Sequence, residues 1–301
     1  MHKAVCVSAQ VRAWVEQQPE GRVHSVFARA CNLAWGDQLI SLVMPAYGMV
    51  PGGVAVALTG EGGWGFLPGE TVSWDAAGQR LRGTRTGVDL AGAPLWANRC
   101  RVGSVASAGV LSARLAELAG VVRQYGRGEL ARALAVWPPA FPAEPADPSR
   151  WSSFAWAPLR TLLEALTDGD AEAVPAALRP VVGLGEGLTP SCDDFLLGLE
   201  AVLYYGRNLL GPRQVGYALR LGAEAARLAR GTTPVSANYL RLAARGGFSE
   251  RLEAVALALL ADAGGDAAAG ARMLIEIGHS SGTDSLVGLI LGTVAILRVT
   301  K

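Results

Sequence analysis

Charge is scarce in this 301-residue sequence. Only 18% of the residues are charged, against roughly 25% in typical soluble domains. The 27 basic and 26 acidic residues are spread along the chain and give a net charge of +1, so no nucleic-acid-binding stripe or basic membrane face is indicated. Two interpretations of the low charge stay open: much of the surface is buried against another subunit, or the composition is simply compact and rich in Ala, Gly and Leu.

Cysteine is also scarce, and long hydrophobic runs are missing. No CxxC pair and no Cys/His spacing suited to zinc occurs, so reduced thiols in the cytoplasm are the simplest interpretation of Cys6, Cys31, Cys100 and Cys192. The first residues lack the apolar core of a secretory signal. The most hydrophobic segment, 285–299, has about 15 residues where a membrane span needs about 20. It predicts a buried core helix.

Short strands are predicted from residue 22 to about 101. Apolar or alternating runs such as LISLVMP, GVAVALTG and TVSWD are separated by Gly, Pro and Asp at intervals of about ten residues. This spacing favours an antiparallel sheet or a small barrel. Strands do not alternate with helices here, which argues against a Rossmann-type fold. The sequence therefore predicts a β-rich N-terminal domain over residues 1–103.

The period becomes helical from Ser104 onward. Apolar residues at three- and four-residue spacing predict an amphipathic helix through Val110, Leu111, Leu115, Leu118, Val121 and Val122. Residues 137–149 are rich in proline and predict an extended connector. Further helices are predicted at 152–167, 171–179, 190–206, 213–229, 234–245, 249–263, 267–277 and 283–298. The expected fold class is α+β, with a mostly α-helical domain over 104–301.

Three predicted helix starts in this domain carry more polar residues than a single cap needs. The first segment, 183–195, reads GLGEGLTPSCDDF, and its Thr189 and Pro190 suit the cap and the first helical position. The second segment, 231–239, reads GTTPVSANY, and the third, 278–285, reads GHSSGTDS. Two interpretations stay open: ordinary capping of three separate helices, or one shared site.

A shared site at these helix starts would accept an anion. Backbone N–H groups, hydroxyls and the positive ends of helix dipoles together bind phosphate or carboxylate. The candidate binding residues are Gly185, Gly187, Thr189, Ser191, Thr233, Ser236, Asn238, Ser280, Ser281, Thr283 and Asp284.

Acidic residues near the same helix starts are candidates for catalysis or for a metal. Asp193 and Asp194 are adjacent, so their side chains point about 100° apart on a helix and at most one is expected to face a shared site. Together with Asp284 they are a possible Mg²⁺ site, because Mg²⁺ takes one or two carboxylates plus phosphate and water. The alternative is a favourable contact with the helix dipole. No cofactor is certain.

His279 and Cys192 are the other candidates for chemistry. His279 stands at the start of the third segment, where it is either a general acid or base or a C-terminal cap of the preceding helix. Cys192 lies at a helix start, which lowers a thiol pKa, but the neighbouring Asp193 and Asp194 oppose the thiolate. Nucleophilic catalysis by Cys192 is therefore disfavoured.

These segments carry a resemblance to a known family. GLGEGLTPSCDDFLLGL, TTPVSANYL and GHSSGTDSLVGLILG, in this order, resemble the motifs of the AllH family, whose members include a subunit of bacterial oxamate carbamoyltransferase. The family's first motif usually reads GLGxGLTPSGDD, so Cys192 stands where glycine is common. The likeness extends weakly over the N-terminal SVF and PGG stretches.

The resemblance implies a role in purine-nitrogen (allantoin or oxalurate) breakdown. The family activity exchanges a carbamoyl group between oxalurate and phosphate in a multi-subunit assembly, so other subunits, and possibly further copies of this chain, are expected partners. Two hypotheses follow: a carbamoyltransferase-like subunit that binds an anionic substrate, or a structural or regulatory subunit docked on a catalytic partner. A stand-alone hydrolase or carboxylase is a weaker third, because the sequence has no serine elbow or biotin-type lysine motif.

Overall fold

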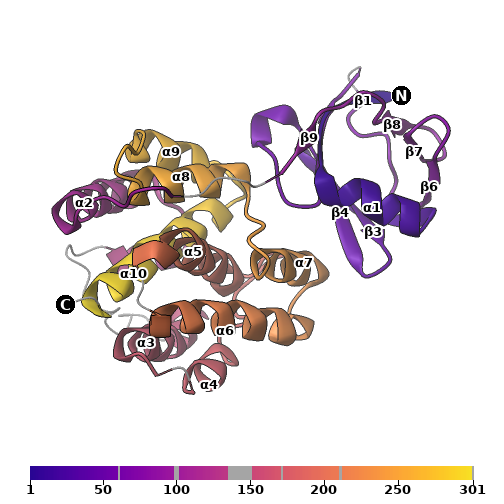
Figure 1. Ribbon diagram of the computed structural model, residues 1–301. Coiled ribbons are helices and arrows are strands. Elements are labelled where there is room, and N and C mark those ends of the chain that lie inside the picture. Colours follow the sequence, from indigo (N-terminus) through magenta and orange to yellow (C-terminus); the bar gives the residue numbers. More distant parts are fainter. Residues whose placement is uncertain (60–61, 98–101, 135–150, 171, 210–211, 300–301) are drawn as a thin grey trace. The chain divides into compact units, whose positions relative to one another are not determined.

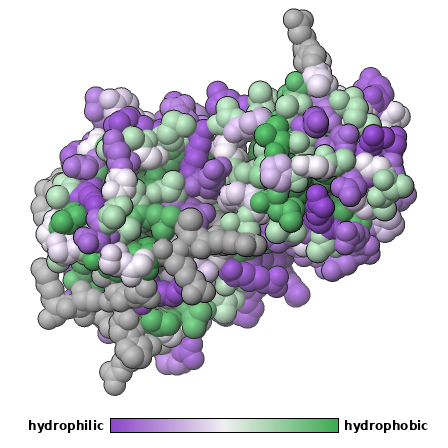
Figure 2. Space-filling model, turned by 45° about the horizontal axis from the view of Figure 1, so that its top comes forward, coloured by the Kyte–Doolittle hydropathy of each residue, from purple (hydrophilic) through white to green (hydrophobic). Residues whose placement is uncertain are grey.

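The chain folds into two compact units, Met1–Arg99 and Cys100–Lys301. The computed structural model describes residues 1–59, 62–97, 102–134, 151–170, 172–209 and 212–299. The first unit holds all the named strands and the second most of the helices (Figure 1), so the predicted α+β class is confirmed. On the face shown in Figure 2, hydrophobic residues are interspersed with hydrophilic ones. The proline-rich stretch 137–149 lies outside the described residues.

The first unit is a closed β-barrel. Its strands are β1 (His2–Ser8), β2 (Glu20–Val26), β3 (Ala30–Trp35), β4 (Gln38–Val43), β5 (Gly53–Ala57), β6 (Thr71–Asp75), β7 (Arg80–Arg82) and β8 (Gly87–Asp89). They are paired in the order β5-β4-β3-β2-β6-β7-β8-β1, and β1 also pairs with β5, which closes the ring. A short β9 (Leu95–Trp96) joins β1. The barrel alternative is thus correct, although β4–β5 and β1–β8 pair in parallel.

The sheet begins earlier than the sequence analysis predicted. β1 precedes residue 22, and the helix α1 (Ala9–Gln17) follows it directly. Both were missed because neither pattern is strong: β1 buries only part of its alternating residues, and α1 buries just Val11 and Val15, one turn apart. The barrel core is filled by buried side chains from the strands and α1, among them Val7, Val15, Leu33, Leu42, Val54, Val72 and Leu81.

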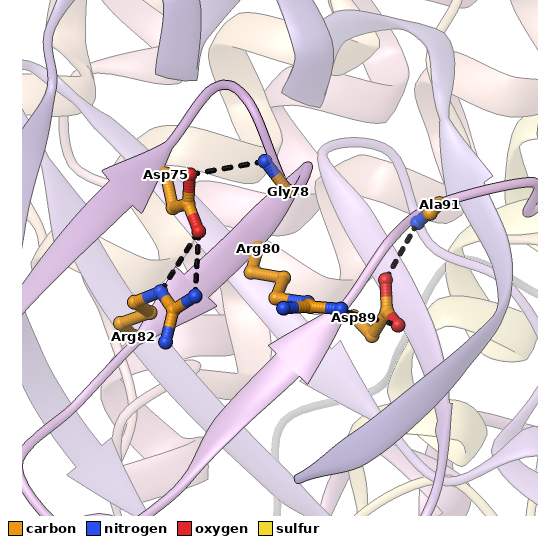
Figure 3. Close-up of polar contacts among 6 residues, drawn as sticks. All are labelled: Asp75, Gly78, Arg80, Arg82, Asp89 and Ala91. Atoms are coloured by element: carbon orange, nitrogen blue, oxygen red, sulfur yellow. Dashed lines mark hydrogen bonds and ion pairs between the residues drawn. The ribbon is translucent and has the colours of Figure 1, made fainter.

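Carboxylates hold the turns on one side of the barrel (Figure 3). Asp75 accepts a hydrogen bond from the Gly78 N–H at 3.0 Å and two from the Arg82 guanidinium at 2.9 and 2.7 Å. The bond from Gly78, followed by that from Arg82, lowers the pKa of Asp75. These contacts fix the register of β6 and β7, whose connecting turn is only a few residues long.

The second unit is a bundle of helices. They are α2 (Ala108–Tyr125), α3 (Trp151–Asp168), α4 (Val174–Leu178), α5 (Ser191–Tyr205), α6 (Pro212–Leu228), α7 (Pro234–Ala243), α8 (Glu250–Leu260), α9 (Ala267–Leu274) and α10 (Ser281–Val299). Every predicted helix is present, with ends within a few residues of the prediction. The helical periodicity was therefore a reliable signal in this half of the chain.

Helices α5 and α10 form the centre of this unit and pack directly on each other. A Cβ atom at Gly198 of α5 would overlap the carbonyl oxygen of Ser285, and one at Gly288 of α10 would overlap that of Phe195. Among the described helices, α10 is the one long and apolar enough to cross a membrane, but 78% of its 18-residue window is buried inside the protein. It is the predicted buried core helix.

Candidate functional site

The first segment is a glycine loop that folds back over the start of α5. Gly183 and Gly185 have φ angles of +80° and +125°, in the left-handed region that favours glycine. A Cβ atom at Gly185 would lie 2.5 Å from the Ser191 nitrogen, so any side chain there would push the loop off the helix. Gly187, also with positive φ, is exposed. The predicted cap is wrong: Pro190, not Thr189, is the N-cap, and α5 begins at Ser191.

Asp193 ties the first segment to the second. Its carboxylate accepts hydrogen bonds from the Gly183 N–H at 2.8 Å and from the Thr232 hydroxyl at 2.5 Å. Burial raises the pKa of Asp193, while hydrogen bonds from Thr232, Gly183 and Ser236 act in the opposite direction. Asp193 is 1% exposed, so these bonds are shielded from water. Its visible role is to join the two segments.

The second segment both caps its own helix and contacts the first. The Thr233 hydroxyl accepts from the Ser236 N–H at 3.2 Å, which is the capping role, and donates to the Leu188 carbonyl oxygen at 2.5 Å. Ser236 and Asn238 are buried in the first turns of α7. The capping interpretation is therefore correct for Thr233, and it does not exclude contact between the segments.

The third segment meets the first through a pair of hydroxyls. Thr189 Oγ1 and Ser281 Oγ lie 2.9 Å apart, within hydrogen-bonding distance. The Ser280 carbonyl oxygen accepts from the Asp284 N–H at 2.8 Å, in the first turn of α10. Thr189, Ser280 and Ser281 are half-buried. These contacts, with those of Asp193 and Thr233, bring all three segments into one cluster.

Asp194 and Asp284 lie together in this cluster, from α5 and α10. Burial raises the pKa of Asp194 well above its usual range, and the negative charge of Asp284 raises it further, whereas the hydroxyls of Ser281 and Thr189 lower it. Burial raises the pKa of Asp284 to about 7, against the opposing effect of the Ser191 and Ser280 hydroxyls. Asp193 and Asp194 thus point to different neighbours: Asp193 bonds to Gly183 and Thr232, whereas Asp194 lies near Asp284.

Helix α2 contributes a fourth piece that the sequence analysis missed. The chain after α2 runs past the third segment: the Arg127 N–H donates to the Thr283 hydroxyl at 3.1 Å, and a Cβ atom at Gly128 would lie 3.6 Å from Asp284 Oδ1. Thr283 is therefore turned toward Arg127. The Arg127 guanidinium lies 3.7 Å from the exposed Glu276 carboxylate. The closely spaced glycines 126 and 128 are the sequence signal that was overlooked.

His279 and Cys192 lie in different environments, one exposed and the other buried. His279 is exposed, between α9 and α10. Helix α9 ends at Leu274 with Ile275 as its C-cap, so of the two interpretations of His279 the capping one does not hold. Cys192 is fully buried, and burial, followed by the charges of Asp193 and Asp284, raises the pKa of its thiol. The argument against a nucleophilic thiolate agrees with this environment.

The aspartates do not form a three-carboxylate metal site. Asp193 is bonded to Gly183 and Thr232. Within the described residues, no group of three or more His, Cys, Asp or Glu side chains is arranged to hold a metal ion. Of the two interpretations of the aspartates, a joint site in which Asp193, Asp194 and Asp284 all bind Mg²⁺ is therefore not supported, and Asp194 and Asp284 are described below as a carboxylate pair.

Glu200 is a further buried acid that the sequence did not single out. It lies on α5, two turns beyond Asp193, and is 4% exposed. Neither carboxylate oxygen has a hydrogen-bond partner among the described residues. Burial alone raises the pKa of Glu200 to about 8. An isolated glutamate between apolar residues of α5 gives no sequence signal, because helical surfaces carry glutamate routinely.

Comparisons with known proteins cover both units. The family described as oxamate carbamoyltransferase subunit AllH matches residues 181–293, which include all three segments. The family described as AllH family N-terminal domain matches residues 3–95, the barrel. No solved structure matches the chain. Because the two matches together span well over half of the sequence, this chain belongs to the AllH family.

Proposed function

We propose that the chain is a subunit of a carbamoyltransferase-like enzyme of purine-nitrogen catabolism, acting in the cytoplasm with other subunits. In this proposal the cluster of the three segments binds a small anionic substrate or phosphate. The observation that carries it is the direct hydrogen bonding of Thr189 to Ser281 and of Thr232 to Asp193, within the region that matches oxamate carbamoyltransferase subunit AllH. Three separate caps would not need these cross-connections.

The proposed site offers donors at its half-buried edge. Thr189, Ser280 and Ser281 provide hydroxyls there. The starts of α5, α7 and α10 add backbone N–H groups and the positive ends of their dipoles. Such fixed donors bind the ground-state anion and stabilise negative charge that develops during carbamoyl transfer.

Three buried aspartates would repel an anion if all were ionised. Burial raises the pKa of Asp284 to about 7, so this carboxyl group is partly protonated near neutral pH and the cluster carries less negative charge than three free carboxylates would. A protonated carboxyl group also donates a hydrogen bond and later accepts the proton back. We assign the proton-transfer role to Asp194, Asp284 or the exposed His279, and the role of holding the segments together to Asp193.

The test uses the full chain purified with its partner subunits. Ser191→Ala and Asp193→Asn are expected to lose most of the carbamoyl-transfer turnover while still assembling. Thr161→Ala and Asp168→Asn are matched controls, because both residues are exposed on α3, and they should keep full activity. Full turnover in both cluster variants contradicts the placement of the substrate site at this cluster.

A non-catalytic structural or regulatory subunit is the second candidate. It is favoured by the observation that the side chains of Thr233 and Asp193 form hydrogen bonds with neighbouring segments of the same chain instead of facing outward. A thermal-shift screen of the isolated chain with phosphate, carbamoyl phosphate, oxamate and Mg²⁺ separates the two. A ligand at 100 times its dissociation constant stabilises the folded state by about 2.7 kcal/mol, which shifts the transition visibly. No shift with any of them favours the structural role.

A further inference from the structure

Three carboxylate oxygens in the cluster are buried and receive no hydrogen bond from the part of the chain that the structure describes. They are Asp194 Oδ2 and both carboxylate oxygens of Asp284. The two side chains are 4% and 0% exposed, so bulk water does not satisfy these atoms. Buried polar atoms are nearly always hydrogen-bonded, because an unpaired one costs about 1–3 kcal/mol. These unpaired acceptors lie at one place, so they can receive donors that the described residues do not supply.

The hydroxyls around the pair, together with a proton held by one of its two carboxyl groups, do not supply a donor to every carboxylate oxygen. Thr189 and Ser281 carry one hydroxyl proton each, and the bond between them uses one of the two, so only one remains for Asp194. Ser191 and Ser280 are near Asp284, but neither makes a hydrogen bond of ordinary geometry with it.

The charged groups that act on the ionisation of the pair are acidic. Asp284 and Asp193 act on Asp194 in this way, and the other groups that act on the two carboxyls are hydroxyls. Among the described residues, no arginine, lysine or histidine appears among the causes of either shift. An internal ion pair does not explain why two carboxyl groups are kept here.

We propose that Asp194 and Asp284 accept the N–H groups of an amide or carbamoyl nitrogen on the substrate. An NH₂ group offers two donors and no good acceptor, which is the complement of two adjacent carboxyl groups. The identification of this ligand class rests on the proposed function, whose substrates carry such a nitrogen next to a carboxylate or phosphate. The oxyanion end then lies at the half-buried hydroxyls of Thr189 and Ser281, and the nitrogen end lies deeper, against the carboxyl pair.

This arrangement makes a specific prediction about ligand choice. A ligand with oxygen in place of the NH₂ group brings a negative charge against two acids, and one with a methyl group leaves the acceptors unpaired. Sites built to hydrogen-bond an N–H group discriminate strongly against analogues that lack it. The pair is thus expected to determine specificity, while the hydroxyls and backbone N–H groups provide the general affinity for anions.

The test is a calorimetric titration of the full chain, with its partner subunits where they are required for binding. Oxamate is compared with oxalate, and carbamoyl phosphate with acetyl phosphate, which has a methyl group in place of the amine. We expect the amine-bearing member of each pair to bind at least about tenfold more tightly. Asp194→Asn and Asp284→Asn keep the side-chain shape but present an amide, and each should abolish most of this preference. The exposed Asp168→Asn should not change it.

Each outcome decides a different claim. Equal affinity within both ligand pairs overturns the inference, although binding of phosphate would leave the proposed anion site intact. Binding that requires Mg²⁺, and is lost on chelation, replaces the N–H groups with a metal and also overturns it. No binding of any ligand in the assembled enzyme overturns both proposals. If the Asn variants fail to fold, the preference of the wild-type chain alone decides the question.

Discussion

Replacing Glu200 with glutamine tests the electrostatics of the helical core. Glu200 lies on α5 and is buried against α6: its Oε2 lies 3.4 Å from the position that a Cβ atom on Gly222 would take. With neither oxygen hydrogen-bonded within the described residues, the ionised form is strongly disfavoured. Burial raises the pKa of Glu200 from 4.5 to about 8, so the folded protein keeps this proton at neutral pH.

The magnitude follows from the linkage between pKa and stability. An acid whose pKa is raised on folding holds its proton in the folded state while the unfolded chain releases it, so stability falls as pH rises from about 4.5 to about 8. Each pKa unit corresponds to about 1.4 kcal/mol, which gives a loss of roughly 5 kcal/mol across the whole window. Glutamine cannot ionise, so Glu200→Gln should remove this contribution.

The assay is urea unfolding followed by far-ultraviolet circular dichroism, which reports mainly on the helical unit, at intervals from pH 4 to pH 9. The free energies of unfolding of wild type and Glu200→Gln should be similar near pH 4, and the variant should become more stable by several kcal/mol above pH 8. Asp194 and Asp284 titrate in the same direction in both proteins, so the difference between the two curves isolates Glu200. Glu164→Gln, exposed on α3, is the matched control.

A difference curve that stays flat within about 1 kcal/mol from pH 4.5 to pH 9 would refute the reasoning. It would mean that Glu200 finds a donor or a cation in solution, so that its ionised form is compensated. A variant that is less stable than wild type at every pH would instead show that the carboxyl group makes a specific contact that an amide cannot replace.

Two further predictions concern packing and capping. Gly198→Ala should destabilise the protein by about 3 kcal/mol or more, because its methyl group would force α5 away from Ser285 of α10. The control is Gly216→Ala, which has nothing within 4 Å of the added methyl group and should be neutral or stabilising by up to about 1 kcal/mol. Equal denaturation midpoints for the two variants would contradict the close contact between the helices. Thr233→Ala should lower the free energy of unfolding by about 1–2 kcal/mol, because the variant loses the cap of α7 and the hydrogen bond to Leu188. Thr233→Ser keeps the hydroxyl and should retain most of the stability. If chemical denaturation finds the serine variant as unstable as the alanine variant, the hydroxyl does not have this role.

Most helices and strands of the fold were predictable from local patterns in the sequence. The helices from α2 to α10 follow apolar residues at three- and four-residue spacing, which a helix must show if one side is to be buried. The barrel strands from β2 onward follow turn residues at regular intervals. Helix α1 and β1 were missed because short elements give few repeats of either period. Closure of the barrel by β1 and β5, which lie far apart in the chain, has no local signal at all.

The segments that form the candidate site were predictable from the sequence, but the contacts between them were not. An excess of hydroxyls, glycines and acids at three helix starts marked the segments, since one cap needs only one hydroxyl. Thr189 was assigned to a cap because its side chain fits that role in isolation; in the structure it contacts Ser281, ninety-two residues later. The contacts of Thr189 and Asp193 join segments that lie far apart in the chain, so no single segment encodes them.

By itself, the sequence determined the α+β class, the positions of most helices and the family to which the chain belongs, because periodicity and motifs are local properties of the chain. Only the tertiary structure decided that Asp194 and Asp284 form a buried pair, that Asp193 joins two segments and that the carboxylate of Glu200 receives no hydrogen bond from the described residues. The ionisation of each group depends on how much water and how many donors surround it, and these are fixed only when α5, α7 and α10 pack together.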